Sequence, residues 1–459
     1  MAWPSSGEAL VTETGVVGYR ELGALVDQAA GEMERAGARP GDPILLCLPN
    51  GVGWVAAYLA IRRIGAVSVP LNPASAPDEI GWVLDDCGAS LALAPAPAIP
   101  PLRAGRRVVW WPDGRPTGER ASPIRPGLYG VTTIAYTSGT TGRPKGALQS
   151  PAAVAAGGRV PAQRLGLGAQ EVVATALPLA HSFGTNVLNA VFEAGATLAL
   201  LRRFDEAGIF GLVNEREARV IAGVPTMYRR LLAHPGALDN LRCALSAGQS
   251  ASAALALDWE RRTGGAFVEG WGMTELAGFA AIGHPGLEGR HGTVGTTAPG
   301  IDLRVANGEL QVRGPAVTKG YLGDPDKTAE AFTDDGWLRT GDVGEIDAAG
   351  RVTIAGRIKD VIVTGGYNVY PAEVERAVSA HPAVRDVAVA GLPDDQRGEI
   401  VCAWVVPHPE HAVTGEQLAE HCREFLASYK LPRRTVLVDR LPLTGTGKIA
   451  RALLPGLVS

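Results

Sequence analysis

Short apolar runs alternate with helical patterns along most of the first 290 residues. Alternation of this kind is typical of α/β units built around a mostly parallel sheet. The segment 95–126, which is rich in Pro, Arg and Gly, is predicted to be an irregular connection. The predicted strands are 43–48, 66–69, 132–135, 171–176, 196–200, 219–223, 242–246 and 266–269. The predicted helices are 53–63, 77–86, 206–216 and 251–263.

The pattern changes in the last third of the chain. From about residue 291 to 356, short strands with Gly-rich turns predict a small β unit, with strands at 308–312 and 350–354. The last hundred residues predict a separate α+β domain with helices at 371–380 and 415–427 and strands at 384–389 and 401–406. We therefore expect an α/β fold with a large N-terminal domain of α/β subdomains plus the β unit (1–357) and a small, mobile C-terminal lid domain (358–459).

Composition narrows the class of protein. The chain has 459 residues, of which 46% are hydrophobic and 20% charged, and its net charge is −4. No basic excess favours nucleic acid as a partner, and no apolar run reaches the roughly 18 residues of a membrane span. The five cysteines lack metal-binding spacing. With no basic and apolar leader, these features predict a cytoplasmic protein with reduced thiols.

Lysine is scarce, and its placement is informative. Only six lysines occur among 43 basic residues. Arg serves wherever a general positive charge is wanted, so a lysine in a special loop suggests a need for a compact, flexible ammonium group. Lys145 and Lys448 each lie in a loop rich in Gly and Thr.

The loop that contains Lys145 has the composition of a phosphate site. It follows the strand 132–135 and reads Tyr-Thr-Ser-Gly-Thr-Thr-Gly-Arg-Pro-Lys-Gly over 136–146. Glycines let backbone N–H groups approach a ligand, and hydroxyl and ammonium groups add donors for phosphate oxygens. The loop is not a Walker A motif, because no Gly-Lys-Ser/Thr is present. The candidate phosphate contacts are Thr137, Ser138, Gly139, Thr140, Thr141 and Lys145.

This loop resembles the phosphate-binding signature of the adenylate-forming superfamily, which includes acyl-CoA synthetases. Further motifs follow in the order of that family and extend the resemblance over nearly the whole chain. They are Gly-Trp-Gly-Met-Thr-Glu at 270–275, Arg-Thr-Gly-Asp at 339–342, Gly-Arg-Ile-Lys-Asp at 356–360, Thr-Gly-Gly-Tyr-Asn at 364–368 and Pro-Leu-Thr-Gly-Thr-Gly-Lys at 442–448.

The resemblance implies a site for ATP. Trp271 and Gly272 would meet the adenine, and Asp342 and Arg357 the ribose. The adenine-binding strand and turn is implied at Gly248 and Gln249, although Gln249 departs from the family pattern.

Four residues take catalytic roles by the same resemblance. Thr274 would donate to the α-phosphate, and Glu275 would bind Mg²⁺, for which a carboxylate oxygen is a suitable hard ligand. His181 would lie near the substrate carboxylate. Lys448 would reach in from the small domain and bridge that carboxylate and the α-phosphate, where cations favour attack between two anions.

The second half-reaction involves another face of the small domain. Lys359 occupies the hinge position of the family. Gly365 and Gly366 fit a narrow tunnel for the pantetheine arm of coenzyme A.

The expected acid is sizeable and apolar: aryl, fatty, alicyclic or terpenoid. Glycine and alanine leave the floor of the predicted acyl pocket open. By the same resemblance, a ligase of dicarboxylates such as malonate would have a basic residue just before the Gly-Trp-Gly motif, where this chain has Glu269. The stretch 181–186 has no acid to hold an α-amino group. Secondary metabolism is a plausible setting. The predicted pocket residues are Phe183, Asn186, Ala247, Gly270, Met273 and Leu276.

The sequence therefore predicts a carboxylic acid–CoA ligase that forms an acyl-adenylate and then a thioester. Its expected partners are ATP, Mg²⁺, coenzyme A and a small carboxylic acid, without nucleic acid or a membrane. Three alternative functions stay open: an enzyme of one half-reaction, a ligase that loads an acyl carrier protein, and a silent ATP- or acyl-binding protein. Assembly as a homodimer also stays open.

Overall fold

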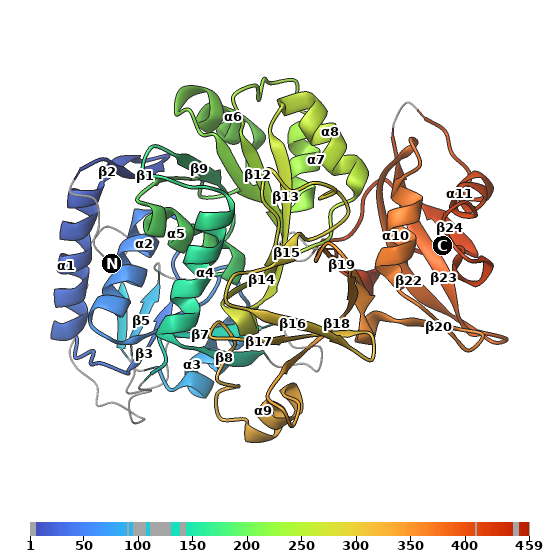
Figure 1. Cartoon of the computed structure of the whole chain (residues 1–459). Coiled ribbons are helices and arrows are strands. Elements are labelled where there is room, and N and C mark those ends of the chain that lie inside the picture. Colours follow the sequence, from blue (N-terminus) through green and yellow to red (C-terminus); the bar gives the residue numbers. More distant parts are fainter. Residues whose placement is uncertain are drawn as a thin grey trace.

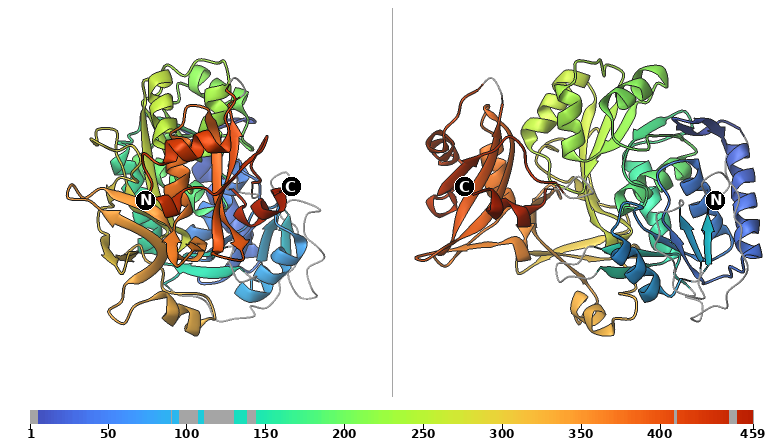
Figure 2. Two further views of the ribbon diagram at one scale, coloured as in Figure 1. Left: turned by 90° about the vertical axis from the view of Figure 1, so that its right-hand side faces the viewer. Right: turned by 180° about the vertical axis from the view of Figure 1, so that it is seen from behind.

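The computed structural model describes residues 6–89, 91–94, 107–110, 130–137, 144–408, 411–443 and 449–458. Within these ranges the chain forms four β-sheets with helices packed around them (Figures 1 and 2). No helix in these ranges is both long and apolar enough to cross a membrane.

The largest sheet has nine strands in its described part. Its central strands, from β13 to β1, pair in parallel, and antiparallel strands close both ends. The order is β15 (Thr296–Thr297), β14 (Gly278–Ile282), β13 (Ala266–Met273), β12 (Cys243–Ala247), β11 (Val220–Gly223), β9 (Val172–Thr175), β10 (Thr197–Leu200), β1 (Glu8–Thr12) and β2 (Gly15–Gly18).

A six-stranded sheet forms the neighbouring unit. It is parallel except for the antiparallel β7–β8 pair, whose strands flank the glycine-rich loop in the sequence. The order is β6 (Arg107–Trp110), β5 (Leu91–Ala94), β3 (Pro43–Leu46), β4 (Val67–Pro70), β7 (Thr133–Thr137) and β8 (Lys145–Gln149).

Helices cover these two sheets and pack with them into several apolar clusters, of which the largest includes strands of both sheets. Several begin at a side-chain cap: the Ser150 hydroxyl accepts from the Ala153 N–H, and the Ser252 hydroxyl accepts from the Leu255 N–H. The helices are α1 (Tyr19–Arg35), α2 (Val52–Arg63), α3 (Pro77–Cys87), α4 (Pro151–Arg164), α5 (Ser182–Ala194), α6 (Glu206–Glu215), α7 (Pro225–Ala233) and α8 (Ala253–Thr263).

A small antiparallel sheet follows, as the Gly-rich turns predict. Its order is β16 (Asp302–Ala306), β17 (Glu309–Arg313), β18 (Leu338–Ile346) and β19 (Val352–Arg357), with α9 (Pro325–Ala331) between β17 and β18 in the sequence. In Figure 1 this sheet lies between the α/β units and the C-terminal part.

The C-terminal part has its own sheet and two apolar clusters, whose members all come from residue 362 onward. The sheet order is β21 (Tyr367–Val369), β20 (Ile362–Thr364), β23 (Gly398–Pro407) and β22 (Val384–Asp394), and β24 (Arg434–Leu437) pairs with β23. The helices are α10 (Pro371–Ser379) and α11 (Gly415–Cys422), with the short helices η2 (Ile358–Asp360), η3 (Ser428–Lys430) and η4 (Arg451–Leu457).

Two local predictions need correction. The expected helix 415–427 ends at Cys422, and the residues after it form turns with hydrogen bonds such as Phe425 N–H to Cys422 O (3.1 Å). The segment 95–126, expected to be irregular, contains strand β6, which pairs in parallel with β5. The rest of that segment lies outside the described residues.

The topology brings several loops to one edge. Strands β9, β11, β12 and β13 are parallel, so their carboxyl ends meet on the same side of the sheet. Parallel α/β sheets bind ligands in the crevice at that side. The motif residues that follow β12 and end β13 therefore lie at this edge.

Candidate active site

A cleft of about 1290 Å³ lies between the large part of the molecule and the C-terminal part. Its walls come from both: Trp271 and Asp342 on one side, Arg376 and Arg451 on the other. The cleft is also lined by most of the predicted site residues that the structure describes, namely Thr137, Lys145, His181, Phe183, Asn186, Ala247, Gly248, Gln249, Gly270, Gly272, Met273, Thr274, Glu275, Arg357 and Lys359.

The residues that flank the phosphate loop in the sequence belong to the β7–β8 pair. Thr137 ends β7 and pairs in register with Lys145 at the start of β8. The Lys145 ammonium lies 5.3 Å from the centre of the Tyr321 ring, a cation–π distance. Ser138, Gly139, Thr140, Thr141 and Lys448 lie outside the described residues.

Tyr321 also contacts Glu275. Its hydroxyl donates to Glu275 Oε1 at 2.8 Å, and the Thr318 N–H donates to the Glu275 backbone oxygen at 2.6 Å. The segment is held in place because the Lys319 N–H donates to the Leu148 oxygen on β8. A predicted metal ligand and a predicted phosphate contact thus share one neighbour, Tyr321.

Thr274 and Glu275 lie on the short helix η1 (Thr274–Leu276). The Ser182 hydroxyl donates to Thr274 Oγ1 at 3.2 Å, and the Gln149 amide donates to the Thr274 backbone oxygen at 2.7 Å. His181 is the N-cap of α5, where its Nδ1 accepts from the Phe183 N–H at 3.4 Å. These contacts bring the start of α5 beside the residues predicted to act on the α-phosphate.

The predicted ribose contacts form a connected group. Asp342 is buried, and Oδ1 and Oδ2 accept from Arg357 Nε at 2.9 Å and from Trp271 Nε1 at 2.8 Å. The Thr340 hydroxyl accepts a hydrogen bond from the Asp342 N–H at 3.0 Å. Gly341, at φ +69°, makes the turn between them in a conformation that side chains disfavour.

Burial shifts the titration of three groups along the cleft. It raises the pKa of Asp342, against the lowering effects of Arg357 and of the Trp271 hydrogen bond. It lowers the pKa of Lys359, and the nearby positive charge of Arg357 acts in the same direction. Burial also raises the pKa of Glu269 to about 8, against the Ala251 N–H bond and the charge of Arg376.

At Gly270, the wall of the predicted acyl pocket differs from the expectation based on the sequence, which was an open pocket floor. A Cβ added there would lie 2.7 Å from the Phe279 ring. The space beside this glycine is therefore filled by Phe279, which itself lines the cleft and makes an edge-to-face contact with Phe183. Leu276 also departs from prediction: it is fully buried in the core and is not among the lining residues.

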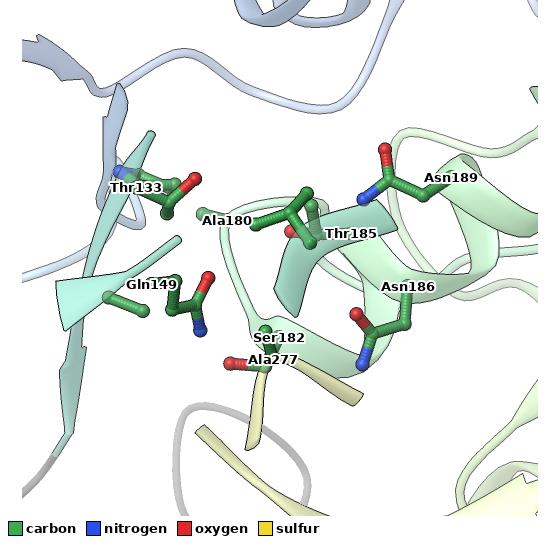
Figure 3. A pocket seen from close by; sticks show the side chains of 11 residues that line it. Thr133, Gln149, Ala180, Ser182, Thr185, Asn186, Asn189 and Ala277 are labelled. Atoms are coloured by element: carbon green, nitrogen blue, oxygen red, sulfur yellow. The ribbon is translucent and has the colours of Figure 1, made fainter. Parts of the chain in front are cut away.

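A smaller pocket of about 20 Å³ lies beside the large cleft at the start of α5 (Figure 3). Asn186 and Asn189 on the helix lie across this space from Thr133 and Gln149 on strands β7 and β8. The pocket shares Asn186 with the large cleft. A space of this size and polarity suits a single water molecule.

Gly365 and Gly366 occupy the turn between β20 and β21, at φ +57° and +82°. They are not among the residues that line the cleft, whereas Ile449 and Arg451 are. In this arrangement the cleft is thus faced by the segment that follows Lys448 in the sequence, and not by the predicted pantetheine turn.

Two residues of this site were missed by the sequence analysis. Tyr321 reaches Glu275 from a segment 46 residues away, and Phe279 reaches Gly270 through the pairing of β13 with β14; neither stands in one of the recognised motifs. Lys319, one of the six lysines, lies two residues before Tyr321 and was the only local signal.

No group of three or more His, Cys, Asp or Glu side chains in the described ranges could hold a metal ion. Glu275 is instead a single buried carboxylate on the wall of the cleft, near Lys145 and Tyr321. One carboxylate fits a Mg²⁺ ion that takes its other ligands from substrate phosphates and water.

The comparisons with known proteins agree with this geometry. The sequence profile of AMP-binding enzymes matches residues 2–322, and the profile of the AMP-binding enzyme C-terminal domain matches residues 373–448. A feruloyl-CoA synthase of Amycolatopsis sp. is 36% identical over 456 residues, covering 94% of this chain and 92% of the relative.

Two further similarities span the whole chain. A methyl-dioxo-octahydroindenyl-propanoyl:CoA ligase of Mycobacterium tuberculosis is 33% identical, over 97% of this chain and 95% of the relative. The crystal structure of ATP-bound MatB from Rhodopseudomonas palustris is 32% identical and superimposes with a TM-score of 0.88, covering 97% of this chain and 95% of that one.

The chain therefore belongs to the AMP-binding enzymes, the adenylate-forming superfamily. Within that superfamily it belongs with the acyl-CoA ligases, enzymes that form AMP from ATP. The fold agrees, because structural neighbours of this class likewise have a large N-terminal and a small C-terminal domain.

Proposed function

We propose that this acid–CoA ligase activates a sizeable apolar acid, with an aryl or alicyclic acid as the first choice. One observation carries the proposal: a single cleft is lined by Thr137 and Lys145 for phosphates, Trp271 and Asp342 for a nucleoside, and apolar side chains beside them. The relatives named for feruloyl and octahydroindenyl acids support a ring-containing substrate.

In the first step, the acid and ATP would form an acyl-adenylate and pyrophosphate. Lys145 would balance phosphate charge, Trp271 and Asp342 would hold the nucleoside, and Thr274 would donate to the α-phosphate. Glu275 would hold Mg²⁺, which supplies charge neutralisation at the phosphates. His181, at the start of α5, would lie near the substrate carboxylate.

In the second step, the thiol of coenzyme A would displace AMP and form the thioester. We propose that the lid domain begins at residue 358, turns about Lys359, and brings the Gly365–Gly366 turn to the cleft. The separate sheet and core from residue 362 onward support this boundary. An acyl carrier protein as acceptor is a further proposal that the same assays address, and assembly as a homodimer is another proposal.

The deciding experiment is a panel of acids assayed in parallel for pyrophosphate and for acyl-CoA. Cinnamic, polycyclic and fatty acids should release pyrophosphate and yield the thioester, and amino acids and malonate should give neither. Pyrophosphate without thioester from free coenzyme A would indicate a carrier protein or a single half-reaction. Absence of acid-dependent pyrophosphate across the panel would refute the proposal in favour of a silent binding protein.

Lys448 provides a test of the catalytic assignment. Lys448→Ala should lower adenylation about 10²–10³-fold, the usual cost of one well-placed charged contact. Thioester formation from a supplied acyl-adenylate should be largely spared, because the lysine would act only in the first step. Equal loss in both single-turnover assays would remove Lys448 from the first step.

A further inference from the structure

Trp271 makes a hydrogen bond through its indole N–H, in addition to the contact with adenine predicted for its ring. Its indole N–H donates to Asp342 Oδ2 at 2.8 Å, and both side chains are buried, at 8% and 3% exposure. The bond joins β13 to β18, 71 residues apart in the sequence. A buried indole N–H needs an acceptor, and a buried carboxylate needs donors, so each satisfies the other.

The other contacts of this carboxylate leave room for a ligand. Asp342 Oδ1 accepts from Arg357 Nε at 2.9 Å, and Oδ2 accepts from Trp271. An ionised carboxylate can accept about four hydrogen bonds, so each oxygen keeps a free acceptor position. A vicinal diol carries two O–H donors and would match these two positions.

The indole N–H also compensates for burial. Asp342 is desolvated, and donors that bond the ionised form are what keep such a carboxylate charged. Arg357 supplies one donor, but its side chain is half-exposed, whereas the Trp271 donor is buried and carried by a β-strand. Without that donor, the carboxylate would lose both an orienting contact and part of its stabilisation.

We propose that Trp271 is a positioning residue for Asp342, so that one side chain serves recognition of the ribose hydroxyls as well as the base. The inference rests on the proposed function, because it takes ATP as the ligand. The geometry is consistent: the base attached to a ribose held at Asp342 would lie beside the ring that holds that carboxylate. Nucleoside selection then depends on the N–H edge of Trp271 and not only on its face.

The test compares ATP with 2′-deoxy-ATP and 3′-deoxy-ATP, in the wild type and in Trp271→Phe. Loss of stacking weakens all three nucleotides alike, because they share the base. Loss of the N–H donor should weaken ATP selectively, so that the preference for ATP over the deoxy nucleotides in kcat/KM falls at least about tenfold. The same ratios are measured for binding by calorimetry without the acid.

Trp259→Phe is the matched control. Trp259 is also fully buried, but its indole N–H has no hydrogen-bond partner among the described residues. This variant should keep the wild-type preference for ATP. If Trp271→Phe does not fold, the same ratios are measured after site-specific replacement of Trp271 by benzothienylalanine, which keeps the bicyclic shape and removes the donor.

The pH profile gives a second readout that a merely structural role would not move. Removing a donor to the ionised form raises the pKa of Asp342 further. The acid limb of kcat/KM for ATP should therefore move to higher pH in Trp271→Phe. The other charged groups around this turn, Arg357, Lys359 and Glu309, are the same in both proteins.

The possible outcomes distinguish the positioning role of Trp271 from the proposed function of the enzyme. An active wild type with an unchanged ATP preference and an unmoved acid limb in Trp271→Phe overturns the positioning role alone. A wild type that neither binds ATP nor releases pyrophosphate with any acid overturns the proposed function as well. A reduced preference in Trp271→Phe, with Trp259→Phe unchanged, supports the inference.

Discussion

Glu275 is the residue where a neighbour matters most for the proposed metal. The Tyr321 hydroxyl bonds its carboxylate at 2.8 Å, and Lys145 lies against the ring of the same tyrosine. Removing a partner that orients a metal ligand typically weakens metal binding 10–100-fold. Tyr321→Phe should therefore raise the Mg²⁺ concentration that gives half-maximal adenylation about tenfold, with a smaller change in kcat at saturating Mg²⁺.

The Mg²⁺ dependence of pyrophosphate release is the measurement. Tyr367→Phe is the control, because Tyr367 is exposed on the C-terminal hairpin and does not line the cleft. An unchanged Mg²⁺ requirement in Tyr321→Phe would show that Glu275 keeps its position without this bond.

The contact between Gly270 and Phe279 gives a second prediction about individual residues. Because an added Cβ would meet the Phe279 ring at 2.7 Å, Gly270→Ala should lower kcat/KM for large and small acids alike. The double variant Gly270→Ala/Phe279→Leu replaces the ring with a smaller side chain and should restore activity. Phe279→Leu alone should shift the preference toward bulkier acids, by about 1–3 kcal/mol of discrimination.

The measurement is kcat/KM across acids of graded size, with melting temperatures as a folding control. If Gly270→Ala instead excludes only the largest acids, the glycine itself forms the pocket floor, as the sequence suggests. If Phe279→Leu does not restore the activity of Gly270→Ala, the Phe279 ring is not the group that the new methyl group contacts.

Residues in contiguous motifs were predictable because the chemistry and the chain order coincide there. Trp271, Thr274 and Glu275 stand together in one motif, and all three line the cleft. Gly270 lines the cleft, but the open space expected beside it is filled, because Phe279 approaches from the paired strand β14. Leu276 failed for a related reason: the short helix η1 turns it into the core.

At the scale of elements, apolar runs predicted most of the parallel strands. The end of α11 at Cys422 and strand β6 were missed, since turn hydrogen bonds and strand pairing override local pattern there. The contact between α4 and Ala277, the residue that follows η1, could not be predicted either, because it depends on the approach of two backbones. A Cβ on Gly157 would lie 2.0 Å from the Ala277 oxygen.

That contact gives a prediction about helix packing. Gly157→Ala should push α4 away from η1, which carries Thr274 and Glu275, and lower the free energy of unfolding by about 1–3 kcal/mol. The kcat/KM for ATP should fall with it. Gly53→Ala is the control, since Gly53 also lies in a helix, α2, and a Cβ there meets nothing within 4 Å. Equal melting temperatures for the two variants would contradict the close packing.

At the scale of the whole molecule, the ion pair between Arg229 and Asp386 joins the two parts across the cleft. Arg229 on α7 lies 2.8 Å from Asp386 on β22, with both side chains largely buried, at 22% and 18% exposure. The proposed rotation of the lid between half-reactions would break this pair. The pair therefore favours the arrangement seen here, in which the segment after Lys448 faces the cleft.

Arg229→Gln should accordingly raise the rate of thioester formation relative to adenylation. A partly buried pair of this kind contributes on the order of 1 kcal/mol, which corresponds to a roughly fivefold change in the ratio of single-turnover rates. Burial raises the pKa of Asp386, so lowering the pH protonates this carboxylate and weakens the pair. In the wild type, the ratio should therefore rise as the pH falls through the pKa of Asp386, and in Arg229→Gln this dependence should be absent.

The neighbouring residue supplies the control. Arg230 pairs with Glu206, 2.5 Å away, and both belong to the large part, so Arg230→Gln removes an ion pair without touching the lid. Both variants lose one arginine charge on the same helix. A ratio that changes in Arg229→Gln and stays at the wild-type value in Arg230→Gln identifies the link between the domains as the cause. The same ratio in both variants would mean that the balance between half-reactions is set elsewhere, in the hinge or in the ligands themselves.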